Sequence, residues 1–165
     1  MKEKKETGHK KEKKVLKILN SREVKHIKAI ISSQWGSCPQ LDYVWLMNAK
    51  EKIYLVTRDI SRIDLSKLRV DSYGIYFGEI KGMEVLRLSI EGSQLIGPTA
   101  TKNVIDVAKE HMRQWLKGED LSVPVSGADG FVIMKYRDDF LGCGKYKEGK
   151  ILNHIPKTRR ILAED

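Results

Sequence analysis

The stretch GFVIMKYRDDFLGCGKYKEGKILNHI, residues 130–155, decides the fold that we expect for the C-terminal part of this chain. Its β-branched and aromatic runs are separated by turn residues at Arg137-Asp138-Asp139 and at Glu148-Gly149, a pattern typical of successive short strands. Several short strands with one helix predict a small, strongly bent sheet or β-pseudobarrel. The expected strands are NVIDV at 103–107, LSVPV at 121–125, and then 130–136, 140–146 and 150–155.

The one helix of this part is predicted in AKEHMRQWLKG, residues 108–118. Ala108, Met112 and Trp115 recur at helical spacing, so we expect them to point inward. Gly118 should end the helix, because glycine readily takes the left-handed conformation that closes a helix.

The first half of the chain has the pattern of a separate α/β unit. A helix is expected from an N-cap at Ser21 to Gly36, since apolar residues recur there on one face. Its apolar stripe consists of Val24, Ile27, Ile31 and Trp35.

Strands and a boundary are expected after this helix. Aromatic and β-branched runs predict strands at 42–48 and 52–59, and a short helical segment is expected at 60–68. The run at 74–90 predicts a hairpin with its turn at Lys81-Gly82. Glycine, serine, proline and threonine then concentrate at 91–103, so we place a domain boundary near Gly97-Pro98.

The chain has 165 residues, a net charge of +9 and a pI of about 9.5. Such a basic balance indicates phosphate-bearing partners first and anionic membrane surfaces second. Residues 1–17 contain eight lysines and three glutamates, which predicts a basic mobile tail over residues 1–18, either a solubilising extension or an arm for phosphates. Because no apolar leader and no run of 18 apolar residues is present, we expect an intracellular, cytoplasmic protein.

Catalytic chemistry is not evident in the sequence. Nucleophile-elbow, zinc-protease and P-loop patterns are missing, and the four histidines are scattered singly. Cys38 and Cys143 have no neighbours at metal-ligand spacing, and Cys143 has no visible base. We therefore expect a binding protein, with no catalytic residues, no cofactor and no metal, rather than an enzyme.

The end of the chain is strongly basic, with six cationic residues against the single acid Glu148 between Leu141 and Leu162. Lysines on an edge strand can simply prevent aggregation. In a chain of this charge, however, the cluster favours nucleic-acid binding, with Tyr146 or His154 available to stack on a base. For Tyr146 the sequence favours packing against the core instead. The predicted RNA-binding residues, expected to converge on one face, are Arg113, Lys117, Lys145, Lys147, Lys150, Lys157, Arg159 and Arg160.

These residues resemble a known domain. RQWLKGEDLSVPVSG at 113–127, followed by the glycines of LGCG at 141–144, is similar to the PUA domain, an RNA-binding pseudobarrel of RNA-modifying enzymes. Gly118 stands for the glycine that closes the helix, and Pro124 stands for the loop proline. Glu119 and Val125 depart from the small residue and the glycine that the family has there, which shifts the expected RNA contact toward the basic cluster.

Over residues 19–162 the chain resembles archaeal ribosome-biogenesis proteins that are grouped with the Nop/Sun/Fmu rRNA methyltransferases and are similar to the Nip-seven-like pre-rRNA processing protein. The resemblance implies an α+β fold, with an N-terminal α/β pre-PUA domain at 19–97 and a PUA domain at 98–165. It implies an RNA-binding protein that assists rRNA processing or modification in ribosome biogenesis. The S-adenosylmethionine loop of a methyltransferase is not found.

Two other functions stay open. The chain could be a catalytically silent substrate-docking subunit of an RNA-modifying enzyme, of the methyltransferase or pseudouridine synthase type. It could also be a modification enzyme with an unrecognised active site. The N-terminal domain is expected to dock ribosome-assembly or RNA-modification proteins, because surplus aromatic residues favour interfaces. Those aromatic residues are Trp35, Tyr43, Trp45 and Tyr54.

Overall fold

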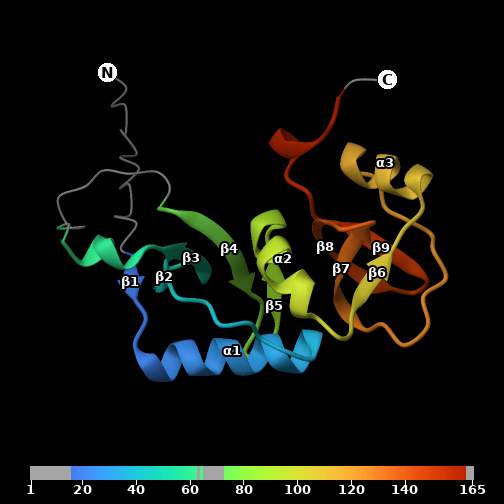
Figure 1. Ribbon diagram of the computed structural model, residues 1–165. Coiled ribbons are helices and arrows are strands. Elements are labelled where there is room, and N and C mark those ends of the chain that lie inside the picture. The colour runs from blue at the N-terminus through green and yellow to red at the C-terminus, as the bar shows by residue number, and fades with distance from the viewer. Residues whose placement is uncertain (1–15, 63, 65–72, 163–165) are drawn as a thin grey trace, which may run out of the picture.

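The computed structural model describes residues 16–62, 64 and 73–162 (Figure 1). These residues form a five-stranded sheet, in the order β1-β2-β3-β4-β5, and a four-stranded sheet, in the order β6-β7-β8-β9. Helix α1 lies along the first sheet, α2 lies between the two sheets, and α3 lies beside the second. The mixture of helices and sheets confirms the predicted α+β class.

Helix α1 (Ser21–Trp35) begins one residue earlier than predicted. Asn20, not Ser21, is the N-cap, and its side chain accepts hydrogen bonds from the backbone N–H groups of Arg22 and Glu23. The Glu23 carboxylate accepts from the Asn20 N–H in return, at 2.9 Å. This reciprocal capping box selects Asn20, because only that register places a glutamate three residues into the helix. Gly36 ends the helix in the left-handed conformation, as predicted.

The first sheet is antiparallel throughout. Its strands are β1 (Lys17–Ile18), β2 (Val44–Met47), β3 (Lys52–Val56), β4 (Ile75–Ile80) and β5 (Leu86–Leu88). The strands expected in 42–48, 52–59 and 74–90 are therefore confirmed. Lys17 and Ile18, expected in the tail, instead pair with β2.

Two other expectations for the first half need correction or fall outside the structure. The β4–β5 connection is a five-residue loop, 81–85, closed by a hydrogen bond from the Lys81 N–H to the Val85 carbonyl, so Lys81-Gly82 is not a two-residue turn. A 3-10 helix, η1, spans Arg58–Arg62 at the start of the expected helix 60–68. Most of the remainder of 60–68, like residues 1–15 of the tail, lies outside the described residues.

A first hydrophobic core fills the space between α1 and the first sheet. The predicted stripe is confirmed at Ile27, Ile31 and Trp35, which are buried, whereas Val24 is half-buried at its edge. Trp45 of β2 and Phe77 of β4 belong to the same core and contact each other edge to face, with ring centroids 5.2 Å apart. Burial of Trp35 and Trp45 removes both from the predicted docking surface, which leaves Tyr43 and Tyr54 as its half-buried aromatic residues.

The glycine-rich run 91–103, where the boundary is placed, lies mostly in the helix α2 (Ile90–Ile96) and in the 3-10 turn that continues it, η3 (Gly97–Thr99). Ser89 caps α2 by accepting a hydrogen bond from the Gly92 N–H at 2.9 Å. Helix α2 contacts β4 of the first sheet and β8 of the second. Packing against both sheets stabilises a short helix whose composition alone favours a loop.

The second sheet has the expected strands, with one exception. They are β6 (Val104–Asp106), β7 (Gly130–Tyr136), β8 (Asp139–Lys147) and β9 (Lys150–Asn153). LSVPV is not a strand, since Leu121 alone makes a β-bridge, to Ile151. Strand β6 pairs with β7 in parallel, and the other pairs are antiparallel.

Helix α3 (Lys109–Lys117) covers one face of the second sheet. Trp115 is fully buried and Met112 half-buried, as predicted, whereas Ala108 is the exposed N-cap. After β9, the expected terminal strand or tail begins as a 3-10 turn, η4 (Lys157–Arg159).

Strand β7 joins the two halves of the molecule. Its side chains alternate between the sheet faces. Val132 and Met134 face a second core with Trp115, whereas Phe131 and Ile133 belong to the first core with α1 and the first sheet. The two sheets therefore share buried surface through β7.

Candidate nucleic-acid interface

Five of the eight predicted site residues lie around the C-terminal end of α3 and the terminal turn. Arg113 and Lys117 are exposed one helical turn apart on α3, and Lys157 is exposed on η4. The Ile161 N–H donates to the Leu116 carbonyl at 3.0 Å, which fixes the terminal segment on α3. We call this set the helix-end group, consisting of Arg113, Lys117, Lys157, Arg159 and Arg160.

Arg160 is held tightly within the helix-end group. It is half-buried against Gly118, and its Nε donates to the Ile155 carbonyl at 3.1 Å. Gly118 has a φ of +90° and leaves room for the arginine, since a Cβ there would lie 2.2 Å from Arg160 Nε. Gly118, which ends α3, thus also allows the Arg160 guanidinium to lie at the C-terminal end of that helix.

Arg159 is partly neutralised. Its Nη1 donates to a carboxylate oxygen of Glu91 on α2 at 2.8 Å, and the Arg159 side chain remains 53% exposed. An exposed ion pair of this kind contributes at most about 1 kcal/mol. Arg159 can therefore exchange Glu91 for another anion at low cost.

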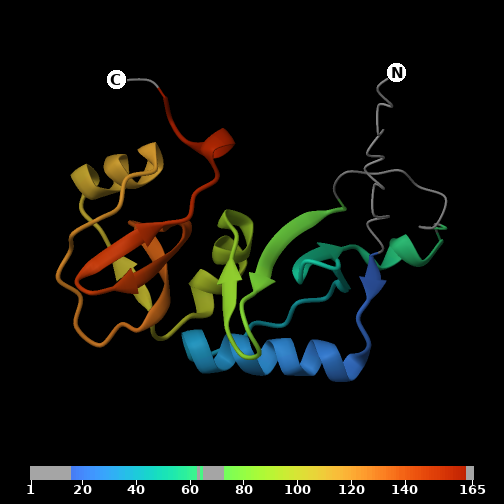
Figure 2. The same ribbon diagram turned by 180° about the vertical axis from the view of Figure 1, so that it is seen from behind.

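The other three predicted residues, Lys145, Lys147 and Lys150, are exposed on the β8–β9 hairpin; we call them the hairpin group. Lys147 pairs with Lys150 across the strands and lies 3.8 Å from the exposed carboxylate of its neighbour Glu148. Lys145 and Lys147 project from the face opposite Tyr146, whose ring packs against the second core below α3. In Figure 2 the β8–β9 turn lies at the end of the sheet away from η4.

The structure thus places the eight residues in two groups, not on one convergent face. Tyr146 is half-buried, and its hydroxyl lies 3.5 Å from the Val125 carbonyl, so it packs against the core as the sequence favoured. His154, the other candidate for stacking, lies between the groups. Its ring is 5.9 Å from that of Phe131, over which the Lys145 ammonium sits at 5.8 Å.

His154 has an unusual environment for a histidine. Its Nε2 is buried and has no hydrogen-bond partner among the described residues. Burial lowers the pKa of His154, and the positive charges of Arg87, Lys145 and Lys81 lower it further, while Asp120 acts in the opposite direction. The imidazole is therefore neutral near pH 7, with one ring nitrogen available for a ligand.

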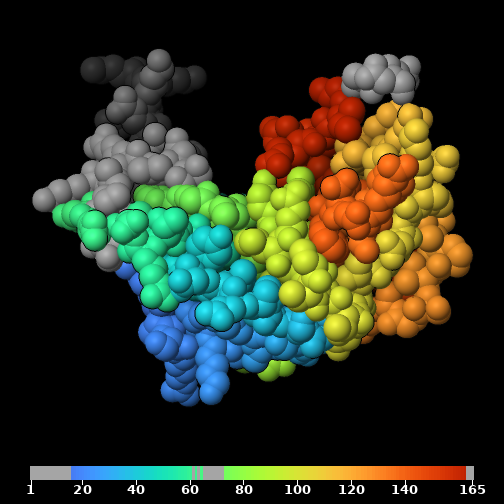
Figure 3. Space-filling model, viewed as in Figure 1, coloured from blue at the N-terminus to red at the C-terminus, as the bar shows by residue number. Residues whose placement is uncertain are grey.

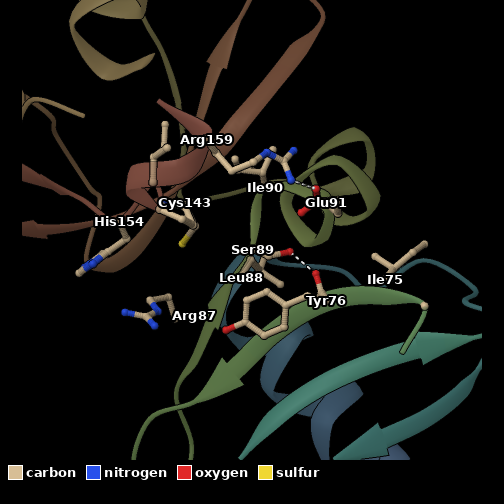
Figure 4. Close-up of a pocket in the computed structure, with 13 residues that line it drawn as sticks. Ile75, Tyr76, Arg87, Leu88, Ser89, Ile90, Glu91, Cys143, His154 and Arg159 are labelled. Atoms are coloured by element: carbon tan, nitrogen blue, oxygen red, sulfur yellow. Dashed lines mark hydrogen bonds and ion pairs between the residues drawn. The ribbon is translucent and has the colours of Figure 1, made fainter. Parts of the chain in front are cut away.

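A cavity of about 390 Å³ lies beside His154, between the two sheets; we call it the inter-sheet pocket. Figure 4 shows its walls, and Figure 3 shows the surface hollowed above α2, between the C-terminal segment and the start of β4. It is lined by Gly74, Ile75, Tyr76, Arg87, Leu88, Ser89, Ile90, Glu91, Cys143, His154, Ile155, Pro156 and Arg159.

Part of the pocket wall comes from the first sheet. Tyr76 and Arg87 lie on the face of that sheet opposite α1, and the Arg87 Nη2 donates to Glu79 at 2.6 Å. Burial raises the pKa of Glu79, but the hydrogen bond from Lys81 and the charge of Arg87 outweigh it, so the pKa lies below its ordinary value. Glu79 therefore stays ionised and fixes Arg87.

Sequence reasoning missed Tyr76, Arg87, Ser89 and Glu91. Strict alternation from the Glu79–Arg87 pair would put Tyr76 on the opposite sheet face, and only the irregular pairing of β3 with β4 brings it to the face of Arg87. Their approach to His154 depends on how the two sheets pack, and this packing cannot be predicted from the spacing of residues in the sequence. Cys143 also lines the pocket, where burial raises the pKa of its thiol to about 12 and makes it a poor nucleophile.

Among the described residues there is neither a membrane-spanning helix nor a cluster of metal ligands. No helix in 16–62, 64 and 73–162 is both long and apolar enough to cross a bilayer. In the same part of the chain, histidine, cysteine and carboxylate side chains do not gather in threes as a metal ion would require.

Comparison with known proteins matches residues 102–161 to the family described as "Methyltransferase RsmF PUA domain". The chain is also similar to curated proteins named "Ribosomal RNA small subunit methyltransferase F". That of Aeromonas hydrophila is 27% identical over 129 residues, which cover 77% of this chain and 26% of the relative. That of Vibrio vulnificus is 26% identical over 121 residues, covering 73% and 25%.

The similarity extends beyond the PUA domain. Only four residues follow residue 161, so an alignment of 129 residues includes much of the chain before residue 102. The chain spans about a quarter of the length of the curated relatives it matches. These matches confirm the resemblance seen in 113–127 and 141–144: residues 102–161 match the PUA domain of RsmF, and the chain is similar to rRNA methyltransferases of that name.

Proposed function

We propose that this chain is a cytoplasmic RNA-binding protein that assists the modification or processing of rRNA in ribosome biogenesis and has no catalytic activity of its own. The observation that carries the proposal is that residues 102–161 combine two features. These residues match the PUA domain of RsmF, and they include all the cationic residues of the helix-end and hairpin groups.

The helix-end group offers a prepared phosphate site. The planar guanidinium of Arg160 is fixed by Gly118 and the Ile155 carbonyl, so little side-chain freedom is lost when it binds. Lys117, Lys157 and Arg159 lie near it on exposed backbone. The hairpin group supplies a second set of cations, and an RNA strand that touches both groups would pass His154.

The N-terminal half is proposed to be a pre-PUA domain, with 19–97 before 98–165. Its partners would be ribosome-assembly or RNA-modification proteins. Two half-buried tyrosines, Tyr43 and Tyr54, remain available for such contacts.

A second candidate is a catalytically silent substrate-docking subunit. Its support is the similarity of the chain to curated proteins whose name describes an rRNA methyltransferase. In this case a separate catalytic protein would act on RNA that this chain holds. Co-purification with a methyltransferase, and a gain in its rate on addition of this chain, would favour this candidate.

The test is the salt dependence of RNA affinity. We would measure binding of a fluorescent 20-nucleotide single-stranded RNA to the wild type and to two double variants, Arg159→Ala with Arg160→Ala and Lys145→Ala with Lys147→Ala. Each phosphate contact to single-stranded RNA contributes a log–log slope of about 0.7, so each double variant should flatten the slope by about 1.4.

The control removes the same charge elsewhere. Lys25→Ala with Lys50→Ala takes two exposed lysines from the first half of the chain and should leave the slope unchanged. An equal change in all three double variants would indicate an effect of net charge alone. An unchanged slope in one variant would exclude its group from the interface.

A further inference from the structure

We propose that the inter-sheet pocket receives one unpaired nucleobase of the bound RNA. This inference rests on the proposed function and adds a second mode of contact to it. The helix-end and hairpin groups would hold phosphates, and the pocket between them would hold a base. Four observations support it: the size of the cavity, its aromatic wall, its charge balance and the unpartnered nitrogen of His154.

The cavity has the size and lining of a site for a small ligand. Its volume of about 390 Å³ lies near the lower end of the range for ligand pockets, roughly 300–1,000 Å³. Leu88, Ile90 and Ile155 give it apolar walls, and Arg87, Ser89 and His154 add a few polar groups. A flat heterocycle with a polar edge fits such a lining.

Tyr76 provides an aromatic surface in the pocket wall. Its ring lies 5.5 Å from that of Tyr54 on the same sheet face, and the Lys52 ammonium sits 5.7 Å from the Tyr76 centroid. These contacts hold the ring in place. Stacking of bases on such rings is a common way in which proteins bind single-stranded RNA, and it tolerates any base.

The charges around the pocket favour a neutral ligand inside it. Arg87 is already bound to Glu79 at 2.6 Å, and Arg159 is bound to Glu91 at 2.8 Å (Figure 4 shows the second pair). With His154 neutral, the interior carries little net charge. A phosphate inside the pocket would have to displace Glu79 from Arg87, whereas a nucleobase would need only the remaining N–H groups of that guanidinium.

His154 also lines the pocket. Its Nε2 atom is buried and has no partner in the described part of the chain. Buried polar atoms are usually satisfied, so this nitrogen calls for an explanation. The hydrogen-bonding edge of a base would supply the partner. The Lys145 ammonium lies over the Phe131 ring, which neighbours His154, and would bind the adjoining phosphate outside the pocket.

The test compares two RNAs that carry the same phosphates. One is a 12-nucleotide oligouridylate, and the other is a 12-mer of the same backbone with every base removed. The wild type should bind the base-bearing strand at least about five-fold more tightly, the minimum expected when one base stacks on an aromatic side chain. Tyr76→Ala and His154→Ala should remove this preference and leave the salt slope unchanged.

Two controls keep the result specific. Tyr76→Phe keeps the ring and should keep the preference. His111→Ala removes a half-buried histidine of α3 that does not line the pocket, and it should behave as the wild type. Because alanine at Tyr76 could disturb the sheet, a 4-thiouridine strand should also be photocrosslinked to the wild type. We expect crosslinks at Tyr76 or His154.

The experiment distinguishes a protein that does not bind a base in the pocket from one that does not bind RNA at all. Equal, salt-dependent binding of both strands by the wild type, with crosslinks confined to the hairpin group, would overturn the pocket and leave the phosphate contacts intact. Binding of neither strand would overturn both proposals.

Discussion

The side chain of Arg160 occupies the space that a Cβ atom on Gly118 would need. The two residues are far apart in the sequence, and the contact joins the end of α3 to the terminal turn. Gly118 has two separate reasons to be glycine: its φ of +90°, and the arginine that covers it.

Replacing Gly118 with alanine should therefore lower both stability and RNA affinity. A left-handed conformation costs a residue with a Cβ roughly 1–2 kcal/mol, and the displaced Arg160 would lose its hydrogen bond to the Ile155 carbonyl. Urea denaturation and RNA titration measure the two losses. Gly127→Ala is the matched control, because Gly127 also has a positive φ of +76° but nothing within 4 Å of its Cβ position. Equal losses in both variants would show that the contact with Arg160 is unimportant.

The capping box of α1 gives a second prediction. Asn20→Ala removes the side-chain oxygen that accepts from the Arg22 and Glu23 N–H groups, and it should reduce the free energy of unfolding by about 1 kcal/mol. Ser21→Ala is the control, since Ser21 lies within the helix and not at its cap. If Ser21→Ala costs as much as Asn20→Ala in urea denaturation, the assignment of the cap is wrong.

The environment of His154 predicts a pH dependence of stability. Its pKa is lower in the folded protein than the value of 6.5 for a free histidine, mainly because of burial. As pH falls below about 6.5 the unfolded chain takes up this proton first, so the folded state loses stability. His154→Gln cannot take up the proton and should lose less stability between pH 7 and pH 5. Urea midpoints across this range measure the difference, and parallel curves would contradict the prediction.

The two cysteines should differ in reactivity. Cys143 is 3% exposed and burial raises the pKa of its thiol to about 12, whereas Cys38 is half-buried and burial raises its pKa less strongly. A disulfide-exchange reagent at pH 8 should therefore label Cys38 in the folded protein and Cys143 only after unfolding. Cys38→Ser should abolish the faster phase of labelling. Rapid labelling of both thiols in urea-free buffer would show that β8 opens readily.

Much of the fold was predictable because long periodic segments carry strong local signals. The stripe of α1 and the β-branched runs of β7 to β9 were identified at their observed positions. Helix α2 was not, because seven residues with Gly92 and Ser93 have low helix propensity, and the helix depends on packing between two sheets. The strand predicted at LSVPV does not form for a related reason, because only Leu121 pairs with another strand.

The candidate site was predictable in composition but not in arrangement. The sequence shows which of the late residues are basic, yet their division into two groups follows from the sheet face on which Lys145 lies and from the docking of Arg160 at α3. The inter-sheet pocket was out of reach, because it brings β4 and β5 against residues that lie more than fifty positions later.

Because the side chains of β7 alternate between two cores, the chain should not tolerate being divided between its two halves. A fragment that began at Pro98 would expose Phe131, Ile133 and Cys143 to water, since their neighbours belong to the removed half. We therefore expect such a fragment to aggregate, and the intact protein to melt in one calorimetric peak, so that residues 98–165 are not separable from the part that precedes them.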